Sequence, residues 1–317
     1  MKNPTTGTYQ QDSLISGGGA KRLTRRDFLR LSGITALAAG GVTLLVGCGP
    51  ASEGTSDSSA SSDSAASSDS SAEASDELRV GMEAAYAPYN WQTTEKTDYT
   101  IPIDGMDGQY ADGYDVQVAK KVGEGLGRTP VAVKLAWDGL IDALNNGQID
   151  VIIAGMSATP ERKQSIDFSD PYFTGSFGLL VLKDSEYANA TKLSDFSGAS
   201  VLGQADTMLD DVIDDIPGVN HLTPADSVPS QLTQLAEKRC DAITYNVENT
   251  KGFLAANPDI TNVKFADGEG FQEQVPANVG VKKGQDDFVK QINDILATIS
   301  DDERQEMFDA AVERQPK

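Results

Sequence analysis

Three residues in the segment 154–170 have the types and the spacing to hold a small anion. Ser157, Thr159 and Arg162 follow the apolar run 151–154, which predicts a buried strand of a parallel sheet. Thr159 and Pro160 then look like an N-cap and a first helical residue, so unpaired N–H groups are expected to point beyond the strand. Such a helix end attracts anions, and a guanidinium in its first turn adds a two-pronged grip on a carboxylate. From this segment alone, a carboxylate site and an ordinary capped helix with a solvated arginine remain equally good interpretations.

The surrounding elements predict an α/β chain with two similar lobes. Apolar strands alternate with helical patterns, which is typical of a parallel sheet with crossover helices. The expected elements of the first lobe are strands 78–82, 131–135 and 149–154 and helices 114–126 and 137–146. Those of the second are strands 199–203, 241–246 and 262–265 and helices near 207–215, 228–237 and 248–256. Ligands of open α/β sheets bind beyond the carboxyl ends of parallel strands, which is where the segment 154–170 begins.

The N-terminal residues indicate export and not a domain. Basic residues precede an uncharged run that ends at Cys48. The stretch TRRDFLR at 24–30 resembles the twin-arginine export motif, and LVGC at 45–48 resembles a bacterial lipobox, whose cysteine is lipidated after cleavage. We therefore expect a signal segment at 1–47 and lipidation at Cys48. The alternative is a single transmembrane anchor, for which the glycine-interrupted run is barely long enough.

Composition limits the remaining classes of function. Residues 48–75 after the anchor are mostly Ser, Ala and Asp, which predicts a disordered tether. The formal net charge of −22 argues against a nucleic-acid partner. Cys240 has no expected disulfide partner and is predicted to be a small buried side chain. The loop DGMDG at 104–108 lacks the acid spacing of a calcium loop, so no metal and no cofactor are expected.

Five segments of the first lobe form a recognisable set, namely LRVGMEAAYAPYNW from Leu78, GYDVQVAKKV from Gly113, WDGLIDALNNGQIDVIIAGM from Trp137, TPERK from Thr159 and IDFSDPYF from Ile166. These segments closely resemble the family 3 extracellular solute-binding proteins of amino-acid ABC transporters, and the similarity continues through nearly all of the globular chain. The resemblance implies a type II periplasmic-binding-protein-like fold, in which each lobe is a parallel-rich sheet flanked by helices. It also implies a monomer that captures an amino acid or similar small carboxylate and delivers it to the permease and ATPase subunits of an importer.

The chain is expected to cross between the lobes near 172–177 and to return near 274–278, as a hinge of two strands that closes on a ligand. The predicted organisation is lobe 1 at 76–174, lobe 2 at 175–276, and a return to lobe 1 with C-terminal helices at 277–317. Ser300 to Glu303 has the pattern of a capping box for the last helix.

The resemblance assigns ligand contacts in both lobes. It implies that Arg162 grips the α-carboxylate and that Thr207 adds a backbone N–H and a hydroxyl from lobe 2; the alternative for Thr207 is a plain N-cap. Tyr86 and Trp137 match positions that hold the ligand between flat apolar faces, and core packing is the alternative for each.

The contacts to a ligand amine are less well defined. Asn246 stands where relatives place an acid for the ligand ammonium, so weaker binding, a role for Glu83 or Glu248, and a ligand without a free α-amine all stay open. Glu83 matches an acid that meets polar or cationic side chains, which gives a weak preference for such amino acids. A surface salt bridge is the competing explanation.

Two other classes remain as alternatives. An enzyme on the same fold, similar to dehydratases or lyases, is one of them, but the chain has a single histidine, His221, and no nucleophile elbow, HExxH motif or Gly-rich phosphate loop. A sensor that presents its bound ligand to a membrane receptor is the other. The favoured expectation is a non-enzymatic binding protein on the extracytoplasmic face of the cell membrane, anchored through lipidated Cys48.

Overall fold

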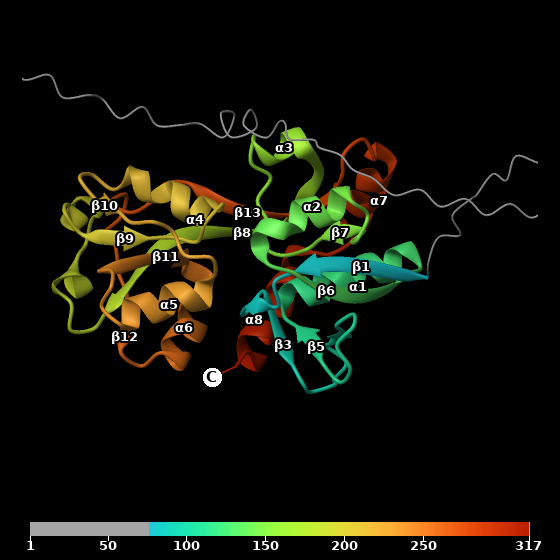
Figure 1. Cartoon of the computed structure of the whole chain (residues 1–317), viewed down its shortest axis with the longest axis horizontal. Coiled ribbons are helices and arrows are strands. Elements are labelled where there is room, and N and C mark those ends of the chain that lie inside the picture. The colour runs from blue at the N-terminus through green and yellow to red at the C-terminus, as the bar shows by residue number, and fades with distance from the viewer. Residues whose placement is uncertain (1–75, 317) are drawn as a thin grey trace, which may run out of the picture. The chain divides into compact units, whose positions relative to one another are not determined.

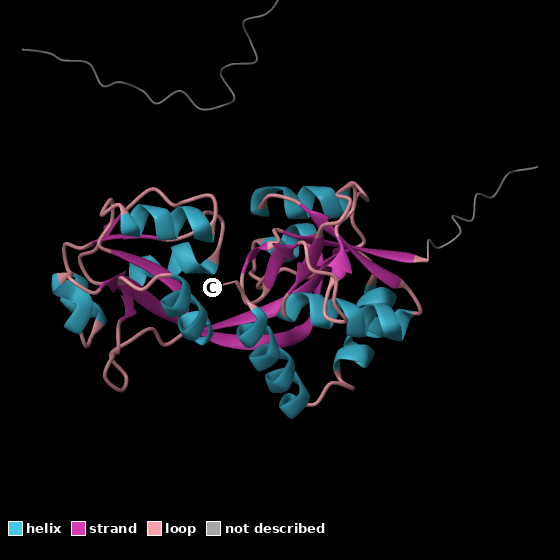
Figure 2. Ribbon diagram, turned by 90° about the horizontal axis from the view of Figure 1, so that it is seen from below, coloured by secondary structure: helices cyan, strands magenta, loops and turns pink. Residues whose placement is uncertain are grey.

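Two long strands, β8 (Ile166–Leu182) and β13 (Gln274–Lys282), connect two lobes (Figure 1). The computed structural model describes residues 76–316. β8 and β13 pair antiparallel from Ser176 and Gln274 to Ile166 and Lys282, with register shifts on both sides of Asn278. In Figure 2 they are the magenta strands that bridge the lobes. The expected two-strand connection is confirmed, and its strands are longer than the crossing segments suggested by the sequence.

Lobe 1 contains a sheet of order β13-β7-β1-β6, in which β7, β1 and β6 are parallel. Its strands are β1 (Glu77–Met82), β6 (Thr129–Lys134) and β7 (Val151–Ile152). Its helices are α1 (Tyr114–Leu126), α2 (Leu140–Asn145), α3 (Arg162–Ser165), α7 (Asp286–Leu296) and α8 (Asp301–Arg314), with a 3-10 helix, η2 (Trp137–Gly139), before α2. A small antiparallel sheet contains β2 (Ala85–Tyr86), β3 (Asn90–Thr93), β4 (Ile101–Pro102) and β5 (Tyr110–Asp112).

The core of lobe 1 forms between β1 and α1. Leu78, Val80 and Met82 alternate along β1 and are fully buried, and they share one apolar cluster with Val122 of α1. α1 ends where Gly127 adopts a left-handed conformation at φ +67°, which suits a residue without a Cβ. The helix predicted at 114–126 is confirmed at both ends.

Lobe 2 continues the sheet in the order β10-β9-β11-β8, with β12 also paired to β8. The strands β10, β9 and β11 are parallel to one another. They are β9 (Ser200–Leu202), β10 (Asn220–His221), β11 (Ala242–Asn246) and β12 (Ile260–Asn262). The helices are α4 (Met208–Asp211), α5 (Val228–Ala236) and α6 (Thr250–Ala256), with 3-10 helices η3 (Glu186–Asn189), η4 (Leu193–Phe196), η5 (Val212–Asp215) and η6 (Val247–Asn249).

Two predicted strands are wrong in extent. The strand expected at 149–154 is only β7, because the chain turns away at Gly155, which has φ +66°. The strand expected at 262–265 lies earlier, since pairing to β8 begins at the buried Ile260 and the regular ladder ends at Asn262. Cys240 is confirmed as a buried free cysteine, and burial raises the pKa of its thiol to about 12.

The predicted signal segment, Cys48 and the tether at 48–75 lie outside the described residues. Within residues 76–316, no helix is long and apolar enough to cross a membrane.

Candidate functional site

Most of the predicted ligand-binding residues line one cavity between the lobes. The cavity has a volume of about 40 Å³. Lobe 1 contributes Glu83, Tyr86, Trp137, Ser157 and Arg162, and lobe 2 contributes Thr207 and Asn246. This volume holds only a few water molecules. A ligand the size of an amino acid therefore enters only if the lobes move apart.

Thr159 was also predicted to bind the ligand, but it does not line this cavity. It lines a second hollow of about 430 Å³, which shares Trp137 and Arg162 with the first. The Thr159 hydroxyl accepts a hydrogen bond from the backbone N–H of Arg162 at 3.3 Å. The predicted Thr159 cap is confirmed, since the N–H of Lys163 also donates to the Thr159 carbonyl at 3.0 Å, but the regular helix α3 begins at Arg162, two residues later than expected, and is four residues long. Thr159 therefore caps the residue that carries the guanidinium.

The Arg162 guanidinium lies between the lobes and is bonded to backbone oxygens. Nη1 donates to the Ser157 carbonyl at 2.8 Å, and Nη2 donates to the Asp206 carbonyl at 2.5 Å. Its central carbon lies 5.2 Å from the centroid of the Trp137 ring. Burial lowers the pKa of Arg162, and the charges of Asp211 and Asp206 oppose that shift. Among the described residues no carboxylate forms an ion pair with Arg162, so the guanidinium is free of a direct ionic partner that would compete with a small anion.

The turn that begins α4 presents a carbonyl to lobe 1. Asp206 has φ +58°, and its carbonyl oxygen also accepts from Trp137 Nε1 at 3.1 Å. Because the N–H and C=O of a trans peptide point in opposite directions, the N–H of Thr207 points away from Arg162. The Thr207 hydroxyl accepts from the N–H of Leu209 at 3.2 Å and donates to the Gln204 carbonyl at 2.8 Å. In this conformation Thr207 is the N-cap of α4, which was the alternative expectation.

At the other side of the cavity, Tyr86 and Asn246 meet across the cleft. The Tyr86 hydroxyl donates a short hydrogen bond to the Asn246 side-chain oxygen. Burial raises the pKa of Tyr86, so its hydroxyl stays protonated. Glu248 does not line the cavity. Its carboxylate oxygens Oε1 and Oε2 accept the N–H of Ser176 in β8 at 3.0 and 3.1 Å. This side of the cavity is therefore polar and uncharged.

Glu83 is the carboxylate of the cavity lining. Both of its oxygens accept from Gln204 Nε2 of lobe 2 at 3.3 Å. Burial raises the pKa of Glu83, and the hydrogen bond from Gln204 opposes that shift. The alternative of a surface salt bridge is not found, because within residues 76–316 no cation pairs with Glu83.

Several lining residues were not predicted from the sequence. They are Ala154, Gly155, Gln204, Met208, Leu209 and Val275. Gln204 and Gly155 follow the carboxyl ends of β9 and β7, so the rule that ligands bind beyond these strand ends was the signal available for both.

Two acidic residues of lobe 2 contact the single histidine of the chain. Asp210 and Asp214 each lie 2.9 Å from a ring nitrogen of His221, which is on β10. Asp210 also lines the larger hollow of the cleft. No group of side chains within residues 76–316 could hold a metal ion.

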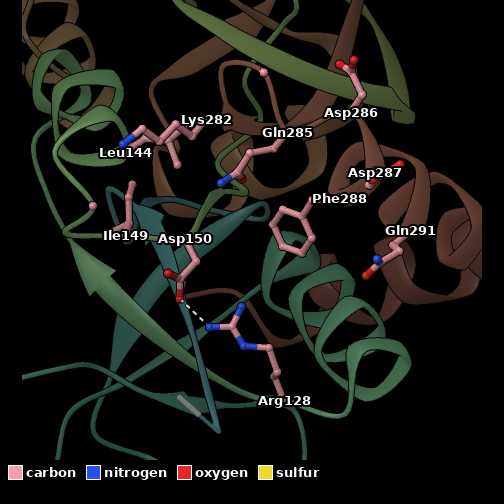
Figure 3. Close-up of a pocket in the computed structure, with 12 residues that line it drawn as sticks. Arg128, Leu144, Ile149, Asp150, Lys282, Gln285, Asp286, Asp287, Phe288 and Gln291 are labelled. Atoms are coloured by element: carbon pink, nitrogen blue, oxygen red, sulfur yellow. Dashed lines mark hydrogen bonds and ion pairs between the residues drawn. The ribbon is translucent and has the colours of Figure 1, made fainter. Parts of the chain in front are cut away.

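A further hollow, of about 830 Å³, lies in lobe 1 and contains none of the predicted ligand-binding residues (Figure 3). In it, Arg128 and Asp150 form an ion pair of 2.9 Å. Asp150 also forms an ion pair with Arg79 at 2.7 Å, so its carboxylate is already bound by two guanidinium groups, and we assign no ligand to this hollow.

Comparisons with known proteins show the family of the chain. The chain is 31% identical over 196 residues to the probable histidine-binding protein of Campylobacter jejuni, a match that spans 61% of this chain and 70% of that protein. It is 29% identical over 226 residues to the L-cystine-binding protein TcyJ of Escherichia coli, spanning 71% and 78%.

A crystal structure of the substrate binding protein of an amino acid ABC transporter has a TM-score of 0.63 at 26% identity, over 75% of this chain and 100% of that one. The fold is the expected two-lobed type II periplasmic-binding-protein fold. Residues 78–310 match the family model described as bacterial extracellular solute-binding proteins, family 3. The chain belongs to the family 3 bacterial extracellular solute-binding proteins.

Proposed function

We propose that the chain is the substrate-binding component of an ABC importer and captures an amino acid or a similar small carboxylate by closure of its lobes. The observation that carries this proposal is Arg162, a partly buried guanidinium between the lobes whose Nη atoms bond to backbone carbonyls. The names of the similar proteins, which bind histidine or cystine, support the same class of ligand.

In this proposal the ligand carboxylate takes the place of the Asp206 carbonyl at Arg162. The guanidinium then holds the carboxylate through two parallel charge-assisted hydrogen bonds, which are stronger than its bond to a neutral carbonyl. Tyr86 and Trp137 supply flat contact faces to the rest of the ligand. Because contacts come from both lobes, ligand binding favours the closed arrangement over the open one.

The charges around the cleft support a preference for polar or cationic amino acids. Glu83 is the acidic side chain in the lining of the inner cavity. The adjoining hollow is lined by Arg162 and by five acids, which are Asp138, Glu161, Asp206, Asp210 and Asp211. A ligand whose carboxylate lies at Arg162 would extend its side chain among these negative charges, which favours a cation or a hydrogen-bond donor.

The enzyme alternative has less support from the cleft. Glu83 lines the inner cavity without a second acid, and neither His221 nor Cys240 is part of the lining. Acid–base catalysis by two carboxylates, or by a carboxylate and a histidine, therefore has no second member in that lining.

The proposal extends to the location and the partners of the chain. Family membership indicates export. We propose that residues 1–47 direct export, that Cys48 carries the lipid anchor, and that residues 48–75 tether the lobes to the membrane. We further propose that lobe 1 (76–174, with the return at 277–317) and lobe 2 (175–276) bind the ligand as a monomer, and that permease and ATPase subunits accept it.

A thermal-shift screen of the purified full-length chain tests the proposed function. The probes are L-arginine, L-histidine, L-glutamine, L-cystine and their deaminated analogues, with sugars as the unrelated class. A ligand that binds only the folded chain raises its unfolding temperature by mass action. We expect a shift for at least one amino acid and none for sugars; a shift for sugars alone, or conversion of an amino acid to a product, would overturn the proposal.

A further inference from the structure

We propose that both strands of the hinge position the ligand-binding loop 155–162, through Tyr172 on β8 and Asn278 on β13, and that Asp115 of α1 holds Tyr172 in place. That the loop binds the ligand rests on the proposed function. The hydrogen bonds that hold the loop are those of the described residues. None of the three residues lines the cavity, so each is a positioning residue.

Tyr172 is the first connection between the hinge and the loop. Its side chain is 1% exposed, and its hydroxyl oxygen accepts the backbone N–H of Gly155 at 2.9 Å. Gly155 lines the cavity and has φ +66°, so this turn leaves an N–H group that no regular strand partner takes. A buried N–H without an acceptor is costly, and the Tyr172 hydroxyl therefore fixes the turn at the start of the loop.

Asp115 determines which way the Tyr172 hydroxyl points. It is completely buried in the first turn of α1, and its Oδ1 accepts the Tyr172 hydroxyl proton at 2.7 Å. Its Oδ2 accepts from Asn90 Nδ2 at 2.8 Å. Because the hydroxyl proton is donated to Asp115, the oxygen lone pairs are free to receive Gly155. The chain of contacts thus runs from α1 through β8 to the loop.

Asn278 is the second connection, and it comes from the other hinge strand. Its Oδ1 accepts the N–H of Ala158 at 3.2 Å, and its own N–H donates to the Met156 carbonyl at 2.8 Å. Its Nδ2 donates to the Ser169 carbonyl on β8 at 2.9 Å. Asn278 lies between the two register shifts of β13, which divert its backbone from the ladder to the loop.

These two connections fix the backbone on both sides of Ser157, whose carbonyl holds Nη1 of Arg162. A displacement of this backbone therefore moves the guanidinium. Since Tyr172 and Asn278 are on the strands that bridge the lobes, the loop is held against the hinge itself and not only against the core of lobe 1. The hinge and the anion-binding loop are thus one mechanical unit.

The ligand-independent test compares Tyr172→Phe with Tyr114→Phe by residue-resolved amide exchange in the full-length chain. Tyr114 is a matched control, because its buried hydroxyl also bonds to β8, at the Tyr172 carbonyl at 2.8 Å, and does not touch the loop. We expect the Gly155 amide to exchange roughly tenfold faster in Tyr172→Phe and to be unchanged in Tyr114→Phe. Equal exchange of Gly155 in the two variants would overturn the inference.

The functional test measures dissociation constants by calorimetry for L-arginine, L-histidine, L-glutamine and L-cystine. We expect Tyr172→Phe and Asn278→Ala to weaken binding roughly five- to tenfold, the loss of about one hydrogen bond. Ser169→Ala is the control for Asn278, since its hydroxyl bonds to Val279 of the same hinge strand and not to the loop. Unchanged affinity in Tyr172→Phe and Asn278→Ala would contradict the inference. If the unmodified chain bound none of the four amino acids, the proposed function would fail, while the exchange test would still decide the positioning role.

Discussion

Arg162 and Asp206 join the two lobes through a hydrogen bond of 2.5 Å from the guanidinium Nη2 to a backbone carbonyl oxygen. Trp137 donates to the same carbonyl at 3.1 Å. The closed arrangement is thus held by a protein oxygen at the place where the proposal puts a ligand carboxylate oxygen. When the ligand binds, its carboxylate oxygen replaces the Asp206 carbonyl oxygen as the acceptor of the hydrogen bond from Arg162. The carboxylate carries more negative charge than the carbonyl, and the lobes can close with either acceptor in place.

Trp137→Phe should weaken ligand binding by roughly tenfold, because the indole N–H loses its contact with Asp206 and the ring loses contact area. Calorimetry with the best amino acid of the thermal-shift screen measures the change. Trp91→Phe is the control, since Trp91 is buried on β3 and does not line the cavity. A similar loss of affinity in both variants would mean that Trp137 acts through the fold and not through the site.

Asn246→Asp should tighten the binding of amino acids with a free α-amine by roughly tenfold. The carboxylate would lie at the end of β11, next to the Tyr86 hydroxyl, and would add a charge-assisted hydrogen bond to an ammonium group. The comparison is between an amino acid and its deaminated analogue in the same variant. If both ligands change equally, the ammonium group does not lie near Asn246.

The pH dependence of stability should report Asp115. Burial raises its pKa to about 6, against the hydrogen bonds from Tyr172 and Asn90, while the unfolded-chain value is 3.8. Since the folded chain prefers the neutral carboxyl, its contribution is fully present below pH 3.8 and is lost as the pH rises through about 6. The loss amounts to roughly 3 kcal/mol.

Asp115→Asn is neutral at every pH and lacks this dependence. Its free energy of unfolding, relative to that of the unmodified chain, should therefore rise by roughly 3 kcal/mol between about pH 4 and pH 7. Denaturant unfolding at several pH values measures the difference. A difference that stays constant over this window would show that Asp115 does not titrate as described.

His221 should give a second linkage, of the same sign, in lobe 2. Burial lowers its pKa, but hydrogen bonds to Asp210 and Asp214 outweigh burial, so the net shift is upward. The protonated ring therefore contributes stability that is fully present below pH 6.5 and is lost as the pH rises through the folded pKa. His221→Gln should remove this dependence, and at pH 6 it should cost about 1–2 kcal/mol of unfolding free energy. Parallel unfolding curves of the two proteins from pH 6 to 9 would contradict the assignment.

The sequence predicted the elements that have clear end signals. α1 begins after Gly113 and ends before Gly127, and both glycines have positive φ, so the helix was found at both ends. Most candidate site residues were assigned by the resemblance to the family 3 solute-binding proteins, and the strand-end rule pointed only to the segment 154–170. Tyr86, Trp137, Arg162 and Asn246 line one cavity although they are far apart in the sequence.

The parts that were missed depend on backbone orientation and on partners distant in sequence. The positive φ of Asp206 turns the Thr207 N–H away from Arg162, and no side-chain pattern indicates that conformation. The contacts of Asp210 and Asp214 with His221 were not predicted, because His221 comes from β10 and no sequence pattern connects it with these acids. The Thr159 cap is as predicted, but the regular part of α3 begins at Arg162, two residues later than expected.

Whether Arg162 holds the ligand carboxylate is tested most directly by calorimetry of Arg162→Ala and Lys163→Ala. The ligand is the amino acid that gives the largest thermal shift. Lys163 is the matched control, since it is the next residue of α3 and does not line the inner cavity. We predict that Arg162→Ala raises the dissociation constant by roughly a hundredfold, as expected for the loss of a charge-assisted, two-pronged contact, and that Lys163→Ala leaves it unchanged. An unchanged dissociation constant in Arg162→Ala would show that the carboxylate is held elsewhere.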